Sequence, residues 1–146
     1  MADNRRVLKK YSESMRHLLK NGYKAKLRPS GHRISKKFRR DHGGAIPANL
    51  LVYSNTDSRS RYFRKCRERN IKPHPARYPP DLPEFFIRFL TDTHEKILDP
   101  FAGSNTTGFV AEKLGRRWMA FEIYEEYFKG SIFRFNEDQI VRSKFR

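Results

Sequence analysis

The sequence predicts an α/β fold in which a small parallel sheet follows a basic, irregular or helical N-terminal segment. Two observations carry this prediction. The C-terminal half has the order strand, helix, strand, helix, and the positive charge is concentrated in the N-terminal half. Strands that alternate with helices pair in parallel, because each helix returns the chain to the same end of the sheet.

The C-terminal elements begin after a rigid, extended stretch, KPHPARYPPDLP, in which each proline fixes its own φ and restricts the residue before it. Asp81 and Glu84 form an Asp-x-x-Glu cap for the next helix. The core side of that helix is expected to be Phe85, Phe86, Phe89 and Leu90. The remaining predicted elements are a strand at 96–99, a helix at 106–114 that Gly115 ends, a strand at 117–123 and an aromatic-rich helix at 124–135.

The N-terminal half has weaker patterns. Residues 8–19 show helical spacing of apolar side chains, and Asn21-Gly22 is a plausible stop. Glycine and proline mark residues 24–48 as loop. Residues 50–53 are expected to form a short strand or a buried turn, and the basic stretch 58–70 a helix.

Charge divides the chain into two predicted regions. Residues 1–72 contain 21 Lys and Arg against 5 Asp and Glu, whereas residues 73–146 contain 11 of each. The whole net charge of +16 therefore lies in the first region. A block this basic, with aromatic side chains among the charges, favours binding of a nucleic acid, and a solvated basic tail is the alternative.

Composition excludes several classes of protein. The single cysteine, Cys66, cannot form an internal disulfide, which fits a reducing cytosol. No run of about 18 apolar residues is present, so no membrane span is expected. The N-terminus shows no secretory signal. We therefore expect a cytoplasmic protein, and the sequence offers no cluster of metal ligands.

The segment DPFAGSNTTG, residues 99–108, lies between a predicted strand and a predicted helix, where a parallel α/β sheet places its ligand crevice. Gly103 lets the backbone approach a ligand without a Cβ in the way. Ser104 and Asn105 are suited to cap the helix, and Asn105 tolerates left-handed geometry. Glu122, 19 residues beyond Gly103, is placed to accept hydrogen bonds from two ribose hydroxyls.

This loop lacks the marks of other nucleotide sites. A dinucleotide site needs three glycines, whereas only Gly103 and Gly108 are present, and the Gly-Lys-Ser/Thr of a phosphate-binding loop is absent. Asp99 would repel a phosphate but suits a cationic ligand end, such as an ammonium or a sulfonium. The residues favour S-adenosylmethionine, and a capping turn without a ligand is the alternative.

Three motifs carry a resemblance to a known family. DPFAGSNTTG resembles the first cofactor motif of the β-group DNA amino-methyltransferases, and WMAFEI, residues 118–123, resembles their second. HPARYPPDLPEFFIRFL, residues 74–90, resembles the motif that precedes these two, and GGAIPANLL, residues 43–51, the stretch upstream of it. The order and spacing are similar to those of the PvuII-type cytosine-N(4) group over residues 28–135, and that group shares Asn105 where the wider family has glycine.

The resemblance implies a partial Rossmann-like sheet of an S-adenosylmethionine-dependent methyltransferase. It assigns the methionine and sugar of the cofactor to the loop residues Asp99, Phe101, Gly103, Ser104 and Asn105. It assigns the ribose to Glu122, the adenine to Ile123, and the closure of the methionine end to His74, Arg77, Tyr78 and Pro79. Phe101 as a core residue and Arg77 as a surface charge are the alternatives.

The resemblance also implies methyl transfer to an exocyclic amino nitrogen, for which this family uses a Ser-Pro-Pro-aromatic or Asp/Asn-Pro-Pro-aromatic segment. The one Pro-Pro pair in the sequence, Pro79-Pro80, follows Tyr78, which is no such acceptor. Methylation of carbon 5 would need a Pro-Cys nucleophile, and Cys66 follows a lysine. No catalytic residue is therefore assigned.

Three functions are compatible with these observations. The chain is the cofactor-binding and DNA-recognition portion of a cytosine-N(4) methyltransferase of a restriction-modification system, acting on double-stranded DNA with a second polypeptide that carries the catalytic motif. Alternatively, it is a truncated, inactive copy, or a basic nucleic-acid-binding protein whose strand–helix–strand unit is structural. The resemblance implies a prokaryotic or phage-type protein associated with the nucleoid. Residues 1–72 would recognise DNA and residues 73–146 would bind the cofactor.

Overall fold

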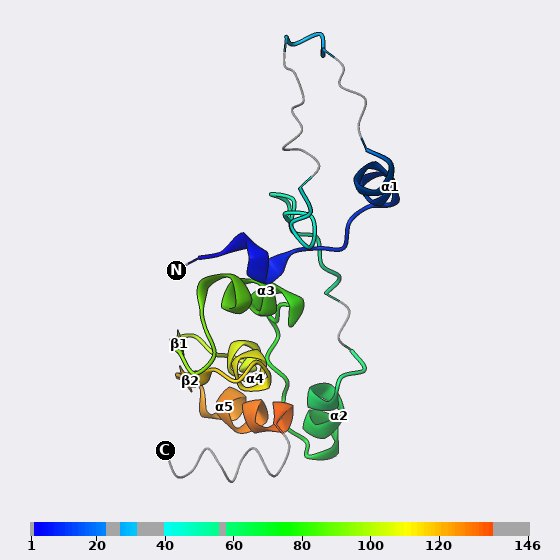
Figure 1. Cartoon of the computed structure of the whole chain (residues 1–146). Helices are drawn as coiled ribbons and strands as arrows, with labels where there is room; N and C mark the ends of the chain where they lie inside the picture. Colours follow the sequence, from blue (N-terminus) through cyan, green and yellow to red (C-terminus); the bar gives the residue numbers. More distant parts are fainter. Residues whose placement is uncertain (1, 23–26, 32–39, 56–57, 136–146) are drawn as a thin grey trace. The chain divides into compact units, whose positions relative to one another are not determined.

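A computed structural model describes residues 2–22, 27–31, 40–55 and 58–135. The chain divides into two compact units, one of Asp3–Asn49 and one that contains Leu50–Arg146 together with Met1–Ala2 (Figure 1). The first unit contains the short 3-10 helix η1 (Asn4–Val7) and α1 (Glu13–Asn21). All the other helices and strands that the structure describes belong to the second unit.

The first unit has a shorter helix than predicted. Ser12 caps α1 by accepting a hydrogen bond from the backbone of Met15, so the prediction of a start near residue 8 was wrong. Lys9 cannot belong to the helix, because its backbone exchanges two 2.9 Å hydrogen bonds with Ala45. The predicted stop is confirmed at Gly22, whose φ is 80°. Of the predicted loop 24–48, residues 24–26 and 32–39 lie outside the described residues.

The sheet of the second unit pairs β1 (Lys96–Asp99) in parallel with β2 (Arg117–Ala120), from Lys96 opposite Arg117 to Asp99 opposite Ala120. The prediction of the first strand is confirmed. The second was predicted to reach residue 123 but ends at Ala120. Beyond it, the backbone N–H of Phe121 donates to Asp99 at the end of β1, whereas the carbonyl of Phe121 accepts a hydrogen bond from Ala102 in the following loop, so the pairing passes from the strand to that loop.

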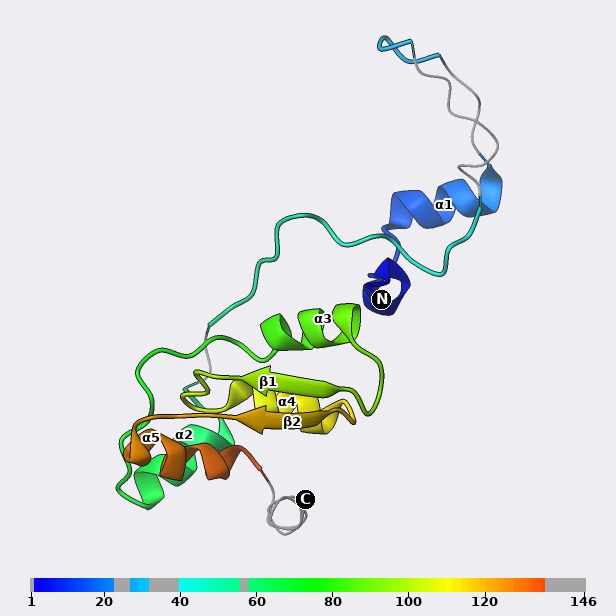
Figure 2. The ribbon, with the colours of Figure 1, turned by 90° about the vertical axis from the view of Figure 1, so that its left-hand side faces the viewer.

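One face of the sheet packs against α4 (Thr106–Lys113), which in turn packs against α3 (Asp81–Leu90) (Figure 2). Ile87, Val110 and Ala111 are the buried centre of this core. The expected core side of α3 was wrong in part, because Phe86 and Leu90 are 45% and 50% exposed. Ile87 faces α4 instead.

The predicted cap of α3 was also wrong. Pro80 occupies the cap position with helical dihedral angles and makes no side-chain hydrogen bond to the helix. Asp81 therefore lies within the first turn, where its negative charge interacts favourably with the positive end of the helix dipole. Glu84 pairs with Arg88 at 2.9 Å instead of reaching back to the cap.

A second layer of contacts joins α2 (Arg61–Glu68) to α5 (Glu125–Ser131) and to the 3-10 helix η3 (Ile132–Arg134). The helical interpretations of 58–70 and 124–135 are confirmed, with a break between α5 and η3. Tyr62 and Cys66 of α2 are each 1% exposed, so this basic helix contributes to the core. Residues 50–53 form neither a strand nor a buried turn, since Leu50 and Val52 are 74% and 79% exposed.

No described element of the second unit covers the opposite face of the sheet (Figure 2). Leu98 of β1 and Met119 of β2 point to this face and are 63% and 60% exposed. Lys96 and Arg117, two residues earlier on the same face, are exposed as well. The predicted α/β class with a small parallel sheet is thus confirmed. Within the described part of the chain, no helix is long and apolar enough to cross a membrane.

Candidate functional site

The candidate site lies at the carboxyl ends of the two strands. The loop that follows β1 runs from residue 100 to Asn105, and Glu122 comes two residues after the end of β2. Because the strands are parallel, both segments meet at the same edge of the sheet, which is where open α/β sheets bind ligands.

Two residues of the loop have left-handed backbone geometry. Gly103 has φ 52° and Asn105 has φ 56°. The side chain of Asn105 accepts a 3.1 Å hydrogen bond from the backbone of Gly108 and so caps α4, which confirms the expected capping role and left-handed geometry. Gly108 is required here, because a Cβ would lie 2.2 Å from Asn105 Oδ1 and 2.8 Å from Trp118 Cε3.

Glu122 lies against this loop. Its Oε2 accepts a 2.8 Å hydrogen bond from the backbone of Gly103, and its Oε1 accepts a 2.9 Å bond from the backbone of Tyr124. A carboxylate offers about four acceptor positions, so two remain for hydroxyl donors of a ligand. The geometry is compatible with the predicted ribose contact, which stays a prediction.

His74 covers the loop on one side. The nearest atoms of its ring lie 3.1 Å from the position that a Cβ of Gly103 would occupy. The ring packs edge-to-face on Tyr127, with centroids 4.5 Å apart, and its Nδ1 lies 2.6 Å from the carbonyl oxygen of Ala76. The structure thus brings His74 together with Gly103, as the predicted site requires.

Arg77 and Tyr78 follow His74 but have different neighbours. The guanidinium of Arg77 lies 4.0 Å from the ring centroid of Phe63 on α2 and also donates to the carbonyl of His74. The hydroxyl of Tyr78 shares a hydrogen bond with that of Thr107 in α4. Burial raises the pKa of Tyr78, so its hydroxyl stays protonated at neutral pH. Pro79 is half-buried behind them.

The loop presents one exposed and one buried set of predicted residues. Phe101 and Ile123 are 88% and 91% exposed, so the alternative of Phe101 as a core residue is wrong. Asp99 is half-buried, and its Oδ1 accepts a 3.1 Å bond from the backbone of Phe101. Ser104 and Asn105 are 3% and 5% exposed. The exposed side chains of Phe101 and Ile123 thus lie near the Glu122 carboxylate and a hydrogen-bonded backbone turn.

Arg134, which is only 7% exposed, was not predicted as a site residue from the sequence. Its Nε donates to the carbonyl of Ser104 at 2.6 Å and its Nη2 to the hydroxyl of Ser104 at 2.9 Å. Tyr62, whose hydroxyl accepts a 2.9 Å hydrogen bond from the backbone of His74, was not predicted either. A sequence signal existed for Arg134, because a single arginine between Phe133 and Phe135 is unusual in an apolar segment and indicates a buried partner.

No group of His, Cys, Asp and Glu side chains among the described residues is arranged to bind a metal ion. The described side chains at this site provide hydrogen bonds, apolar contacts and a carboxylate.

Comparisons with known proteins identify the family. Residues 3–133 match the family described as DNA methylase. The type II methyltransferase M.PvuII of Proteus hauseri is 47% identical over 98% of this chain, and M.BglII of Bacillus subtilis is 31% identical over 68%. A solved structure titled PvuII DNA methyltransferase (cytosine-N4-specific) aligns with 68% of this chain at 49% identity and a TM-score of 0.60.

These relatives are longer than this chain. It spans 44% of the length of M.PvuII, 28% of that of M.BglII and 35% of the chain in the solved structure. The match to the family nevertheless extends through both units and includes the loop at the carboxyl end of β1. The chain therefore belongs to the DNA methylase family.

Proposed function

We propose that this chain binds S-adenosylmethionine and DNA as one portion of a site-specific, cytosine-N(4) DNA methyltransferase of a restriction-modification system. A second polypeptide supplies the Ser-Pro-Pro-aromatic motif that this sequence lacks. The cytosine-N(4) target is that named for the similar solved methyltransferase.

The observation that carries the cofactor assignment is the contact between Glu122 and Gly103. This contact fixes a carboxylate beside Gly103, a residue of the turn that has no Cβ, at the carboxyl edge of a parallel sheet. The cofactor's ribose hydroxyls would donate to Glu122, its adenine would rest on the exposed Ile123, and its sulfonium end would face Asp99. His74, Arg77, Tyr78 and Pro79 would close the methionine end.

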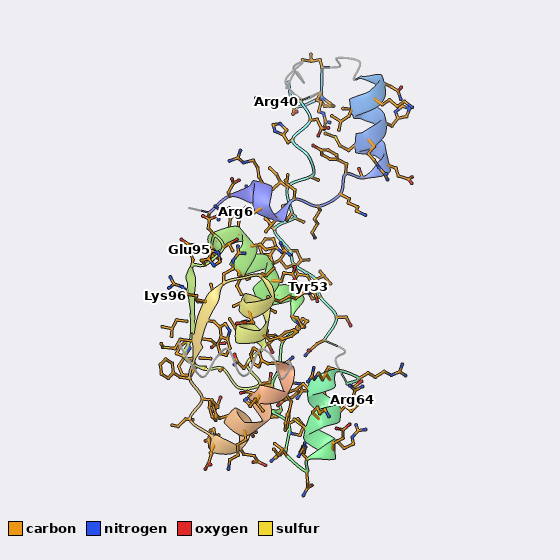
Figure 3. All side chains as sticks on the ribbon, turned by 60° about the horizontal axis from the view of Figure 1, so that its bottom comes forward. Arg6, Arg40, Tyr53, Arg64, Glu95 and Lys96 are labelled. Carbon is orange, nitrogen blue, oxygen red and sulfur yellow. The ribbon has the colours of Figure 1, made fainter. Side chains whose placement is uncertain are left out.

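The proposed DNA surface rests on the distribution of charge. Lys10, Arg16 and Lys20 of the first unit are exposed, and so is Arg64, which lies on the side of α2 that faces away from α5 (Figure 3). Exposed basic side chains that contact phosphates give affinity without sequence selectivity. We assign the predicted region 1–72 to this role.

The proposed second polypeptide rests on the uncovered sheet. Parallel sheets are normally buried on both faces, whereas Leu98 and Met119 are more than half exposed here. Two strands are also too few for a stable open sheet. A partner that adds strands and covers this face would bring the catalytic motif to the carboxyl edge.

The cofactor assignment is tested by titration calorimetry with S-adenosylmethionine on wild type, Glu122→Ala and the control Glu126→Ala, which removes an exposed carboxylate from α5. We expect Glu122→Ala to weaken binding by about 1.5–3 kcal/mol, as for hydrogen bonds to a charged group, and Glu126→Ala to have no effect. Equal affinities for wild type and Glu122→Ala would remove Glu122 from the site.

The DNA assignment is tested with two matched double substitutions in the full chain. The log of the affinity for duplex DNA falls as the log of the salt concentration rises. Lys10→Gln with Lys20→Gln should make this fall less steep, reducing the magnitude of the slope by about 2. The control, Lys96→Gln with Lys113→Gln, removes two exposed charges from the neutral half and should leave the slope unchanged. Equal losses in both variants would mean that the basic half has no special role.

The partner is tested by tritiated methyl transfer to mixed-sequence duplex DNA. The chain alone should transfer nothing, because it has no acceptor to hold the target amino group, and a polypeptide with the Ser-Pro-Pro-aromatic motif should restore transfer. Transfer by the purified chain alone would assign catalysis to Tyr78 to Asp81. Absence of transfer with every candidate partner would favour the inactive copy.

A further inference from the structure

We infer that Arg134 and Tyr62 are positioning residues that hold the cofactor loop in its binding geometry before any ligand arrives. The inference rests on the proposed function of the same loop. Neither residue is proposed to touch the cofactor.

Arg134 holds the inner side of the loop. Its guanidinium donates to both the carbonyl and the hydroxyl of Ser104, and all three groups are withdrawn from water, since Ser104 and Arg134 are 3% and 7% exposed. Hydrogen bonds from a charged donor are about twice as strong as neutral ones, and two from one planar group fix orientation as well as distance. Ser104 lies between the left-handed residues Gly103 and Asn105, where the backbone most needs an external constraint.

Tyr62 holds the outer side of the loop through His74. Its hydroxyl accepts the backbone N–H of His74 at 2.9 Å, and the ring of that histidine lies against Gly103. The ring of Tyr62 also lies 4.7 Å from the guanidinium carbon of Arg134, within the range of a cation–π contact. The two residues therefore contact each other, and each reaches the loop by a different route.

These contacts come from opposite ends of the second unit. Tyr62 belongs to α2 and Arg134 to η3, which pack together although about half of the chain separates them. The contacts of Tyr62 and Arg134, here called the brace, thus hold the loop from elements outside the strand–helix–strand unit that carries it. A loop that is already ordered in its binding geometry lowers the free-energy cost of binding. Weakening the brace should therefore lower the affinity for S-adenosylmethionine while leaving every proposed cofactor contact in place.

Two conservative variants test the brace. Arg134→Lys keeps the charge but loses the planar fork, and Tyr62→Phe keeps the ring but loses the hydroxyl. Arg116→Lys is the control for the first, because Arg116 also donates to two backbone carbonyls, those of Thr91 and Leu114, next to the opposite ends of the strands. Tyr11→Phe is the control for the second, because the hydroxyl of Tyr11 likewise accepts a backbone N–H, in the first unit.

The primary measurement is amide hydrogen exchange of Gly103 and Asn105 in the ligand-free chain, which does not depend on the proposed function. We expect about tenfold faster exchange at these amides in Arg134→Lys and Tyr62→Phe, with no change in either control and no change at Val110 in the core. S-adenosylmethionine affinity should fall by a similar factor in the two brace variants. Unchanged loop exchange, or exchange that rises equally at Val110, would overturn the inference even if the wild type binds the cofactor. Failure of the wild type to bind, with faster loop exchange in the variants, would overturn the proposed function and leave the brace standing.

Discussion

Asn105 offers a sharp test of the loop geometry, because two separate physical effects meet at one residue. Its φ of 56° places it in the left-handed region, and its side chain caps α4 through the backbone N–H of Gly108. Replacement by glycine removes the cap and leaves the backbone relaxed. Replacement by alanine removes the cap and adds the strain of a Cβ in left-handed geometry.

The size of each effect follows from the structure. Loss of a helix cap costs about 1 kcal/mol on average, and here Gly108 is buried, so water does not easily replace the lost acceptor. Left-handed geometry costs alanine roughly 1–2 kcal/mol. Asn105→Ala should therefore destabilise the second unit by about 2–3 kcal/mol, and Asn105→Gly by about 1 kcal/mol or less.

Urea unfolding followed by the fluorescence of Trp118 measures these changes. Trp118 is the only tryptophan in the sequence, and its ring stacks on Phe135 with centroids 5.1 Å apart, so its signal reports on the second unit. Asn70 is the matched control, because its φ is 51° and it is exposed, so Asn70→Ala tests the backbone strain without this cap. A loss with Asn105→Gly as large as that with Asn105→Ala would refute the left-handed assignment.

Three further predictions concern the core and the sheet of the second unit. Burial is the main cause that raises the pKa of Tyr62 and of Cys66 in the folded chain. The stabilisation from their bound protons is therefore complete below the unfolded pKa values, about 10 for tyrosine and about 8.5 for cysteine, and is lost as pH rises through the folded ones. The free energy of unfolding should therefore fall by on the order of 1 kcal/mol per pH unit above about pH 9. In the double variant Tyr62→Phe with Cys66→Ala the fall should be smaller. Parallel pH profiles of wild type and double variant would contradict this. Gly108→Ala should cost at least about 2 kcal/mol in the same urea assay, from overpacking and loss of the cap, and a change below about 0.5 kcal/mol would show that the turn is looser than described. Leu98→Gln with Met119→Gln should leave the stability of the isolated chain within about 0.5 kcal/mol of wild type but weaken association with the second polypeptide, and a large loss of stability would show that this face is already packed.

Local sequence signals predicted the parts of the fold that local forces determine. The strand at 96–99 is an apolar run between turn residues, and Gly115 follows the last turn of α4 with a φ of 73°. Asn105 was predicted to cap the helix and to accept left-handed geometry, since few other side chains do both. Each of these features depends on residues within a few positions of one another, so no tertiary information was needed.

The errors arose where packing decides the outcome. Phe86, Ile87 and Leu90 are all apolar and lie at helical spacing from the buried Pro83, three, four and seven residues later, yet only Ile87 among them is buried, where α3 packs against α4. Composition alone does not give the direction of a helix face when apolar residues surround it. The contact between Arg134 and Ser104 joins residues 30 positions apart, and no motif records it.

The proposed separation of cofactor binding from catalysis has a structural basis. The polar groups that shape the loop, from Glu122 and Asn105 to Arg134, form their hydrogen bonds within the second unit. The loop therefore needs no additional strand to adopt its geometry, whereas a flipped base needs an acceptor and a stacking partner that these residues do not supply. A portion built in this way should bind the cofactor first and gain activity only when its uncovered sheet face is paired. If it does, affinity for S-adenosylmethionine should change little when the second polypeptide is added, while methyl transfer should rise from nothing.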